Sequence, residues 1–361
     1  MKKQKDELRS SRVFIQTWPA TSFVIPSLFY RFSDFESYPP RVNFGVRIDS
    51  TMDFGRIDAA DLDGVDLTLP SDHEGTTQAL RMSSAKNTEV FVGCAKWGRK
   101  DWVGKIYPEG TKEADFLSHY ATHFNCIELN ATFYRLPSVR QTAAWSEKVG
   151  ESFKFCPKFS NRITHIKRLK DAERYTDIFA EGISAFGNKL GPCFLQLPPN
   201  YPPGNYDVIE AYLEALPRDL ELFVELRHPK WYSEPDAFDR IFRILERQKA
   251  GAVITDAAGR RDCVHMRLTT AEAFIRFVGN GLHPTDYTRV DDWVQRIKSW
   301  MDHGIERVFF FMHQHEELHS PELSRYVIQQ LNKHCGTNIA EPKFVAKEVS
   351  KPVRKKRTAR K

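Results

Sequence analysis

The chain has 361 residues, of which 41% are hydrophobic and 28% are charged. This composition excludes a collagen, a coiled coil and a wholly disordered chain. No run approaches the roughly 18 apolar residues that a membrane-spanning helix requires, so we expect no membrane partner. The six cysteines are far apart and form no Cys-x-x-Cys pair. We therefore expect a reduced, cytoplasmic protein rather than a disulfide scaffold or a zinc site.

The formal net charge of +6 is concentrated at one end of the chain. Residues 341–361 contain nine Lys or Arg against two Glu, which leaves a net charge of −1 for all the preceding residues. A basic segment with little to bury is expected to be a disordered, solvated tail. The alternative is that this tail makes a weak nucleic-acid contact by neutralising phosphates.

The amino-terminal part of the chain lacks any sustained hydrophobic period. Residues 1–51 contain Pro19, Pro26 and the pair Pro39-Pro40 among scattered aromatic residues. We expect a poorly ordered leader there, and we hypothesise that Met52 is the true start of the protein. Residues 52–87 are richer in turn-forming residues and form an N-terminal extension.

Between residues 88 and 340, short β-branched or aromatic runs alternate with segments of helical period. The spacing predicts helices around Phe238–Leu245 and Val290–Met301, and Ser320 before Pro321 indicates a helix start. There are eight apolar runs: Glu89–Cys94, Asn125–Leu129, Phe153–Pro157, Cys193–Leu197, Glu221–Leu226, Ala252–Asp256, Ala273–Gly279 and Arg307–His313.

This alternation predicts a parallel α/β fold with right-handed crossovers, and its length matches a closed (β/α)8 TIM-type barrel. An open doubly wound sheet is the alternative. It is disfavoured because Gly93–Gly98 has neither the dinucleotide-binding nor the P-loop spacing. The sixth crossover is short, since about 16 residues separate runs six and seven, so we expect one irregular connection.

In such a barrel the carboxyl ends of the strands share one mouth, where active sites lie. Most of the runs end in a group suited to acid–base chemistry or strong hydrogen bonding: Glu128, Asn130, Lys158, Gln196, Glu225, Arg227, Asp256, Arg276, His313 and Gln314. Any one of these residues has a purely structural alternative, such as an ion pair that closes the barrel. For the whole ring we favour a functional pocket, because burying several charges without function is costly.

Six segments identify a family resemblance: VGCAKWGRKDWVGKIYPEG, HFNCIELNATFYRLP, FKFCPKFSNRITH, GPCFLQLPPNY, LFVELRHPKWY and FIRFVG. In this order, over residues 88–338, they resemble the YecE-like family (domain of unknown function 72). The resemblance implies a TIM-type barrel with a pocket. The family's motif positions fall on Trp97, Tyr107, Glu128, Asn130, Thr132, Phe133, Tyr134, Lys158, His165, Gln196, Pro198, Glu225, Arg227, His228, Trp231, Asp256 and Arg276.

The chain departs from this family pattern on its last two strands. Where relatives typically read Arg-Leu-His-Gly, this chain has Arg276 followed by Phe277, Val278 and Gly279. Where relatives often have an Asn pair, it has residues 312–315, Met-His-Gln-His. Chemistry that depends on that His or those Asn residues would be altered here.

We expect an enzyme that acts by acid–base chemistry on a small anionic substrate bearing a phosphate or a carboxylate. The predicted catalytic residues are Glu128, Lys158, Glu225 and Asp256. The predicted substrate-binding residues are Trp97, Asn130, Tyr134, His165, Gln196, Arg227, His228, Trp231 and Arg276. Glu128 or Glu225 would act with a pKa raised towards neutrality. A Schiff base on Lys158 is a minor alternative.

Three other interpretations remain open at the level of sequence. A divalent metal on Glu128, Glu225, Asp256 and His313 is disfavoured because nearby arginines repel a cation, so no metal is expected and the cofactor is unknown. A non-catalytic ligand-binding protein would use the same pocket. Nucleic-acid binding is supported by basic and aromatic residues around the end of the third run. The basic residues are Lys158, Arg162, Lys167, Arg168 and Lys170, and the aromatic residues are Phe155 and Phe159.

Overall fold

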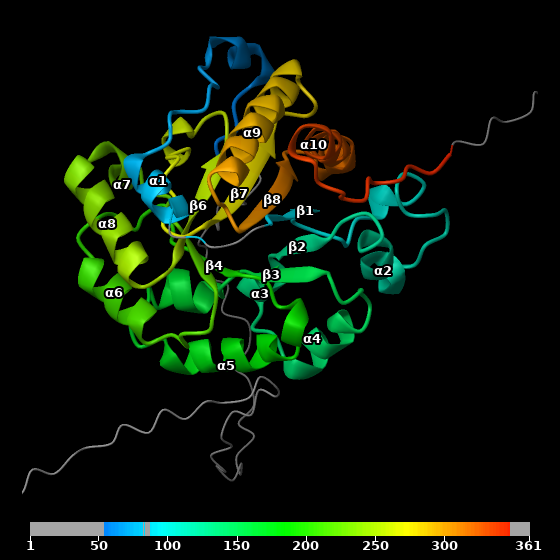
Figure 1. Cartoon of the computed structure of the whole chain (residues 1–361). Coiled ribbons are helices and arrows are strands. Elements are labelled where there is room, and N and C mark those ends of the chain that lie inside the picture. The colour runs from blue at the N-terminus through cyan, green and yellow to red at the C-terminus, as the bar shows by residue number, and fades with distance from the viewer. Residues whose placement is uncertain (1–53, 82, 84–86, 347–361) are drawn as a thin grey trace, which may run out of the picture. The chain divides into compact units, whose positions relative to one another are not determined.

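The computed structural model describes residues 54–81, 83 and 87–346. The expected leader at 1–51 and residues 347–361 of the expected tail lie outside the described residues. Eight parallel strands run in the order β3-β2-β1-β8-β7-β6-β5-β4 (Figure 1). The strands are β1 Glu89–Cys94, β2 Cys126–Leu129, β3 Lys154–Pro157, β4 Cys193–Gln196, β5 Leu222–Glu225, β6 Gly251–Asp256, β7 Glu272–Gly279 and β8 Arg307–Gln314.

The barrel closes between its two outer strands through a few contacts. β3 and β4 are joined by isolated bridges, which pair Phe155 with Leu190 and Lys158 with Phe194. The amide of Phe159 also donates a hydrogen bond to the Phe194 carbonyl at 2.9 Å. The predicted (β/α)8 barrel is therefore confirmed, as a nearly closed barrel.

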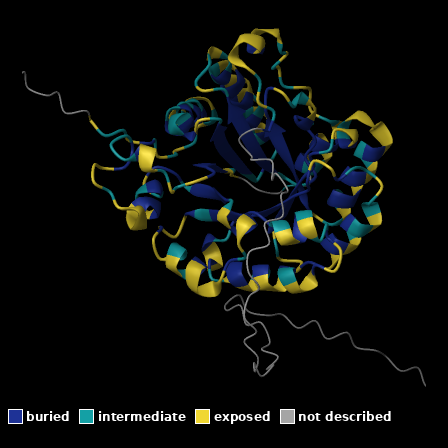
Figure 2. Cartoon of the chain, turned by 180° about the vertical axis from the view of Figure 1, so that it is seen from behind, coloured by how far each residue is buried: buried dark blue, intermediate teal, exposed yellow. Residues whose placement is uncertain are grey.

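Helices lie around the barrel, and the buried strands stand inside a ring of helices whose outer faces are exposed (Figure 2). The α-helices are α1 Glu74–Arg81, α2 Phe116–Tyr120, α3 Ala131–Tyr134, α4 Val139–Ser146, α5 Glu173–Ser184, α6 Tyr206–Glu214, α7 Lys230–Ser233, α8 Pro235–Arg247, α9 Pro284–Asp302 and α10 Ser320–Cys335. α8, α9 and α10 each carry a proline in the first turn, where its missing N–H costs nothing. Between β6 and β7 only a 3₁₀ turn at Arg261–Cys263 occurs, which confirms the irregular sixth crossover.

Alternation along the strands separates a core between the strands and the helices from a second core inside the barrel. Most inward-facing side chains at the amino-terminal half of the barrel are apolar: Phe91, Cys126, Cys156, Phe194, Phe223, Val253, Phe274, Phe309 and Phe311. The Phe274 ring lies 4.7–5.3 Å from the rings of Phe194, Phe223 and Phe311. Because every second residue of a strand faces the same side, the next inward position lies two residues farther along. On seven strands that next position is polar: Glu128, Lys158, Gln196, Glu225, Thr255, Arg276 and His313. The apolar, mostly aromatic side chains thus lie directly below these seven polar side chains, which we call the polar layer.

The described part of the N-terminal extension packs near the carboxyl ends of β5, β6 and β7. The Phe54 ring is buried with Ala257, Cys263 and Val278, and its centroid lies 3.9 Å from the Arg227 guanidinium carbon. Gly55 has a φ of +69°, and a Cβ there would stand 2.7 Å from the Ala257 Cβ, so glycine is required.

The described segment beyond Ala340 stays against the rest of the fold as far as Val345. Val345 N donates to Lys105 O at 2.8 Å, and Lys343 N donates to His123 Nδ1 at 3.2 Å. Phe344 packs on the outer core, so the segment has something to bury, which the charge pattern alone does not reveal. Among the described residues, no helix is long and apolar enough to cross a membrane.

Candidate functional site

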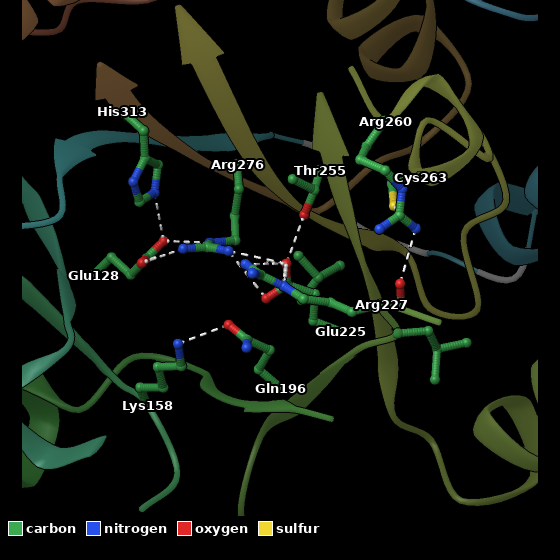
Figure 3. Close-up of polar contacts among 12 residues, drawn as sticks. Glu128, Lys158, Gln196, Glu225, Arg227, Thr255, Arg260, Cys263, Arg276 and His313 are labelled. Carbon is green, nitrogen blue, oxygen red and sulfur yellow. Dashed lines mark hydrogen bonds and ion pairs between the residues drawn. The ribbon is translucent and has the colours of Figure 1, made fainter. Parts of the chain in front are cut away.

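Arg276 of β7 stands at the centre of the polar layer and joins two buried carboxylates (Figure 3). Its Nε and Nη2 donate to the two oxygens of Glu128 on β2 at 2.8 and 2.9 Å. Its Nη1 donates to both oxygens of Glu225 on β5 at 2.9 and 3.0 Å. All three side chains are almost completely buried. Such a forked contact fixes the positions of both acids relative to the guanidinium plane.

Each carboxylate has further hydrogen-bond donors on other strands or in the segments that follow them. Glu128 accepts from Asn130 Nδ2 at 2.8 Å, and its other oxygen lies 3.0 Å from His313 Nε2 of β8. Glu225 accepts from Thr255 Oγ1 at 2.9 Å and from Arg227 Nε at 3.1 Å. The acids are therefore held by side chains from three other strands, β6, β7 and β8, and from the segments that follow β2 and β5.

The electrostatics of this network keep both acids ionised. Burial by itself raises the pKa of Glu128, but Arg276 and His313 outweigh it and hold that pKa well below its ordinary value. For Glu225, burial is likewise outweighed by Arg227, Arg276 and Lys158, which lower its pKa to about 2. The expectation of a carboxyl with a pKa near neutrality is wrong for both, because Arg276 contacts both at once.

Lys158 follows β3 and enters the same layer without joining the carboxylates. Its Nζ donates to Gln196 Oε1 at 2.7 Å and lies 4.3 Å from the centroid of the Phe133 ring. The side chain is buried, and it forms no ion pair with a carboxylate of the described residues. Burial first, and then the positive charges of Arg276 and Arg227, lower its pKa well below the ordinary value. The layer thus contains three basic side chains, of Lys158, Arg227 and Arg276, and two carboxylates.

His165 lies beside this lysine, on a single π-helical turn at Arg162–Ile166. Its Nδ1 lies 2.8 Å from Thr164 Oγ1, and its ring packs edge-on against Phe133 at 5.0 Å between centroids. Burial and the charges of Lys158 and Arg227 lower the pKa of His165 to about 4. The neutral ring can therefore serve as a hydrogen-bonding partner at neutral pH.

Asp256 lies on the other side of its strand. Its carboxylate accepts from Arg289 Nη2 and Trp293 Nε1 of α9, each at 2.7 Å, and it also pairs with Arg261. The register pairs Thr255, not Asp256, with Arg276. Paired positions on adjacent strands face the same side, so Asp256 points outward to the helices. The expectation that Asp256 faces the shared mouth is wrong.

Four other predicted binding residues have no hydrogen bond to this network. Trp231 is fully buried and donates to Tyr201 O at 2.8 Å, as a core side chain does. His228 accepts from the Lys230 amide, and Trp97 packs edge-on against another indole. Tyr134 is 60% exposed. The structure thus unites Glu128, Asn130, Lys158, Gln196, Glu225, Arg227 and Arg276, and leaves these four outside.

Two polar residues of interest escaped the sequence analysis. Thr255 bonds to Glu225, and only its register with Arg276 identifies it as inward-facing, because β6 is buried on both faces. Glu317 is 3% exposed, and it accepts from Ser320 Oγ at 2.6 Å. Burial raises the pKa of Glu317. It begins a 3₁₀ turn, Glu317–His319, after β8, where no strand periodicity exists to point to it.

Two alternative interpretations lose part of their support. In the described part of the chain, no group of three or more His, Cys, Asp and Glu side chains is arranged to hold a metal ion. The Arg276 guanidinium fills the space between the two nearest acids instead. Phe155 and Phe159, which were expected to stack on nucleic-acid bases, are fully buried in the core.

The lowered pKa values predict how stability depends on pH. Between about pH 6.5 and 4, the unfolded chain binds protons that His165 and His265 do not bind in the folded state, so stability falls as pH falls. Between pH 4.5 and about pH 2, protonation of Glu225 lowers the free energy of unfolding by roughly a further 3 kcal/mol, by the same linkage. Denaturant unfolding at a series of pH values measures this.

The matched variants for this measurement are His165→Gln and, as a control, the exposed His303→Gln. The first should flatten the slope of stability between pH 6.5 and 4, whereas the second should leave it unchanged. Equal slopes for the two variants would show that His165 titrates normally in the folded protein.

Comparison with known proteins agrees with this fold. The family model described as "Protein of unknown function DUF72" matches residues 91–345. The UPF0759 protein YecE of Escherichia coli (strain K12) is 27% identical over 262 residues, which cover 68% of this chain and 93% of that protein. The UPF0759 protein YunF of Bacillus subtilis (strain 168) is 28% identical over 155 residues, which cover 40% of this chain and 53% of that protein.

Solved structures of the same family show the same fold. A DUF72 family protein from Enterococcus faecalis V583 has a TM-score of 0.55 at 16% identity, over 70% of this chain and 98% of that one. One from Thermotoga maritima MSB8 has a TM-score of 0.52 at 22% identity, over 68% of this chain and 99% of that one. With the family model spanning most of the barrel, the chain belongs to the DUF72 family.

Proposed function

We propose that this protein is an enzyme that binds a small anion, bearing a phosphate or a carboxylate, among the polar residues at the carboxyl ends of the strands. It performs acid–base chemistry on that anion. The observation that carries the proposal is the buried Lys158 amine, which has no carboxylate ion-pair partner among the described residues. A buried cation without a counter-ion is costly, and structural lysines are rarely kept in this state.

The ion pairs divide the network into two parts. The frame is Arg276 with Glu128 and Glu225, and the reactive group is the Lys158 amine. Arg276 and the two acids satisfy one another, so they act as positioning residues. Lys158 has one hydrogen bond to Gln196 and therefore retains donors for a ligand oxygen. A lysine whose pKa is lowered by burial and by neighbouring cations gives up its proton more readily than an exposed lysine, as a proton-transfer group must.

Asn130 adds a feature that fits a polar ligand. Its Nδ2 is committed to Glu128, while its Oδ1 is buried and has no hydrogen-bond partner among the described residues. Buried polar atoms are normally paired, so an orphaned acceptor beside the network is a natural partner for a substrate hydroxyl. Arg227 supplies a second cation beside Lys158 for the anionic group.

The test compares thermal stabilisation by a panel of small phosphates and carboxylates in three proteins. The wild type and the control Lys170→Met, an exposed lysine in the segment after β3, should be stabilised by the same compounds. Lys158→Met should lose that stabilisation. If no compound stabilises the wild type more than Lys158→Met, anion binding at this site is refuted.

Each stabilising compound is then incubated with catalytic amounts of protein and followed by proton and phosphorus NMR. We expect turnover by the wild type and by Lys170→Met, and its loss in Lys158→Met. Stabilisation without turnover would contradict the enzyme proposal and favour a non-catalytic ligand-binding protein.

A cytoplasmic location is part of the same proposal. All six cysteines are free thiols, and five of them are buried in the fold. Free buried thiols are typical of proteins kept in a reducing compartment. The basic segment 341–361 supports, through its charge alone, a weak nucleic-acid contact.

A further inference from the structure

The Lys158 amine, besides its free donors, has the surroundings of an activated nucleophile. The amine lies 4.3 Å from the Phe133 ring centroid and 5.7 Å from that of Phe194. Its hydrogen-bond acceptor among the described residues is the neutral amide oxygen of Gln196. The side chain is 1% exposed and pairs with no carboxylate of the described residues, and burial without a counter-ion disfavours the ammonium form relative to the free amine.

A second cation reinforces this effect, because the charge of Arg276 also lowers the pKa of Lys158. The Arg276 guanidinium carbon lies 5.6 Å from the centroid of the Phe194 ring, against which the Lys158 amine also lies. Arg276 is held in place by ion pairs with two carboxylates, so its charge stays near the amine. Lysines activated as nucleophiles are desolvated or stand next to another cationic group, and Lys158 meets both conditions.

We propose that Lys158 forms an imine with the carbonyl group of an anionic aldehyde or ketone. This inference rests on the proposed function, since the anionic group of the substrate must bind first. The substrate class is thereby narrowed from small anions to oxo-acids and phosphorylated carbonyl compounds. The class of reaction is one that needs a temporary electron sink beside a carbonyl carbon.

The step balances without an oxidant or a cofactor. The lone pair of the neutral amine forms a C–N bond to the carbonyl carbon, and the carbonyl electron pair moves to its oxygen, which takes up a proton. The nitrogen loses a proton, and the resulting hydroxyl then leaves as water after a second protonation. One amine, one carbonyl and one proton thus give one protonated imine and one water. The positive charge of the imine would stand near the Glu128 and Glu225 carboxylates.

The experiment is reductive trapping with glyoxylate, the smallest anionic aldehyde, and with pyruvate. Sodium borohydride converts the imine to a stable amine, so the intact mass should rise by the mass of the compound less one oxygen. Peptide mapping should place the gain on Lys158. The control Lys170→Arg should be trapped like the wild type, whereas Lys158→Arg keeps the charge and should lose the adduct.

Lactate separates failure of this inference from failure of the proposed function, because it is an anion without a reducible carbonyl. Stabilisation of the wild type by lactate and glyoxylate with no adduct on Lys158 would overturn the imine and leave anion binding intact. Absence of stabilisation and of adduct would overturn both. Equal adducts in the wild type and in Lys158→Arg would assign the reaction to exposed lysines and would also overturn the imine. Melting curves of Lys158→Arg verify that it is folded.

Discussion

Replacing Arg276 with methionine should lower the free energy of unfolding by about 3–5 kcal/mol, the usual result of leaving a buried charge unpaired. The change removes the cation from between Glu128 and Glu225, both almost fully buried. Each acid keeps some hydrogen-bond donors, but the compensating charge that lowers both pKa values is lost. Chemical denaturation of the purified variant measures the loss.

Arg307→Met is the matched control for this prediction. Arg307 also contacts two acids, Glu221 and Glu272, but at the amino-terminal end of the barrel, where its side chain is 18% exposed. Partly solvated ion pairs contribute little, so we expect a loss of about 1 kcal/mol or less. Adding Glu128→Gln to Arg276→Met should recover part of the stability, because it removes one unpaired charge. Equal losses for the two arginines would contradict the account of the frame.

Replacing Asp256 with alanine should also cost about 3–5 kcal/mol, without changing the response to anions. The loss arises because Arg289, which is 1% exposed, keeps Asp286 as its remaining ion-pair partner only at 3.5 Å. The indole N–H of Trp293 is left without its acceptor as well. Denaturant unfolding gives the loss, and ligand-induced thermal stabilisation gives the response to anions.

Asp262→Ala is the control for Asp256→Ala. Asp262 lies in the same crossover and pairs with Arg260 while partly exposed, so its removal should cost about 1 kcal/mol or less. A milder variant, Asp256→Asn, separates structure from function, because it keeps the side-chain volume. Wild-type stability with loss of turnover in Asp256→Asn would restore Asp256 as a catalytic residue and contradict its outward placement.

The barrel and most of the polar layer were predictable because both follow from short-range patterns. Eight apolar runs separated by helical segments leave few alternative topologies. Glu128, Lys158, Gln196 and Arg276 each follow an inward apolar residue by two positions, which the strand period alone requires. Their meeting at one level then follows from the closure of the barrel.

The direction of Asp256 was not predictable from its own strand. β6 is buried on both faces, so its hydrophobicity does not distinguish the inner side from the outer side. Only its register with β7 makes Thr255 the neighbour of Arg276. The lowered pKa of Glu128 was not predictable for a similar reason. It depends on contact with Arg276, which lies 148 residues away in the chain.

The predictions for Trp231 and His228 failed for a different reason. Trp231 and His228 follow β5 in sequence, but their directions are set by the turn into α7, not by the strand period. Trp231 therefore enters the outer core rather than the mouth. Buried aromatic residues near strand ends serve packing as readily as binding, and only the contacts distinguish the two roles.

A crystal structure of the protein with its most stabilising anion tests the central claim most directly. The account predicts an anion oxygen within hydrogen-bond distance of Lys158 Nζ, with Arg276 still held between Glu128 and Glu225. An anion bound only elsewhere, with the Lys158 amine paired to a carboxylate of the chain, would contradict it.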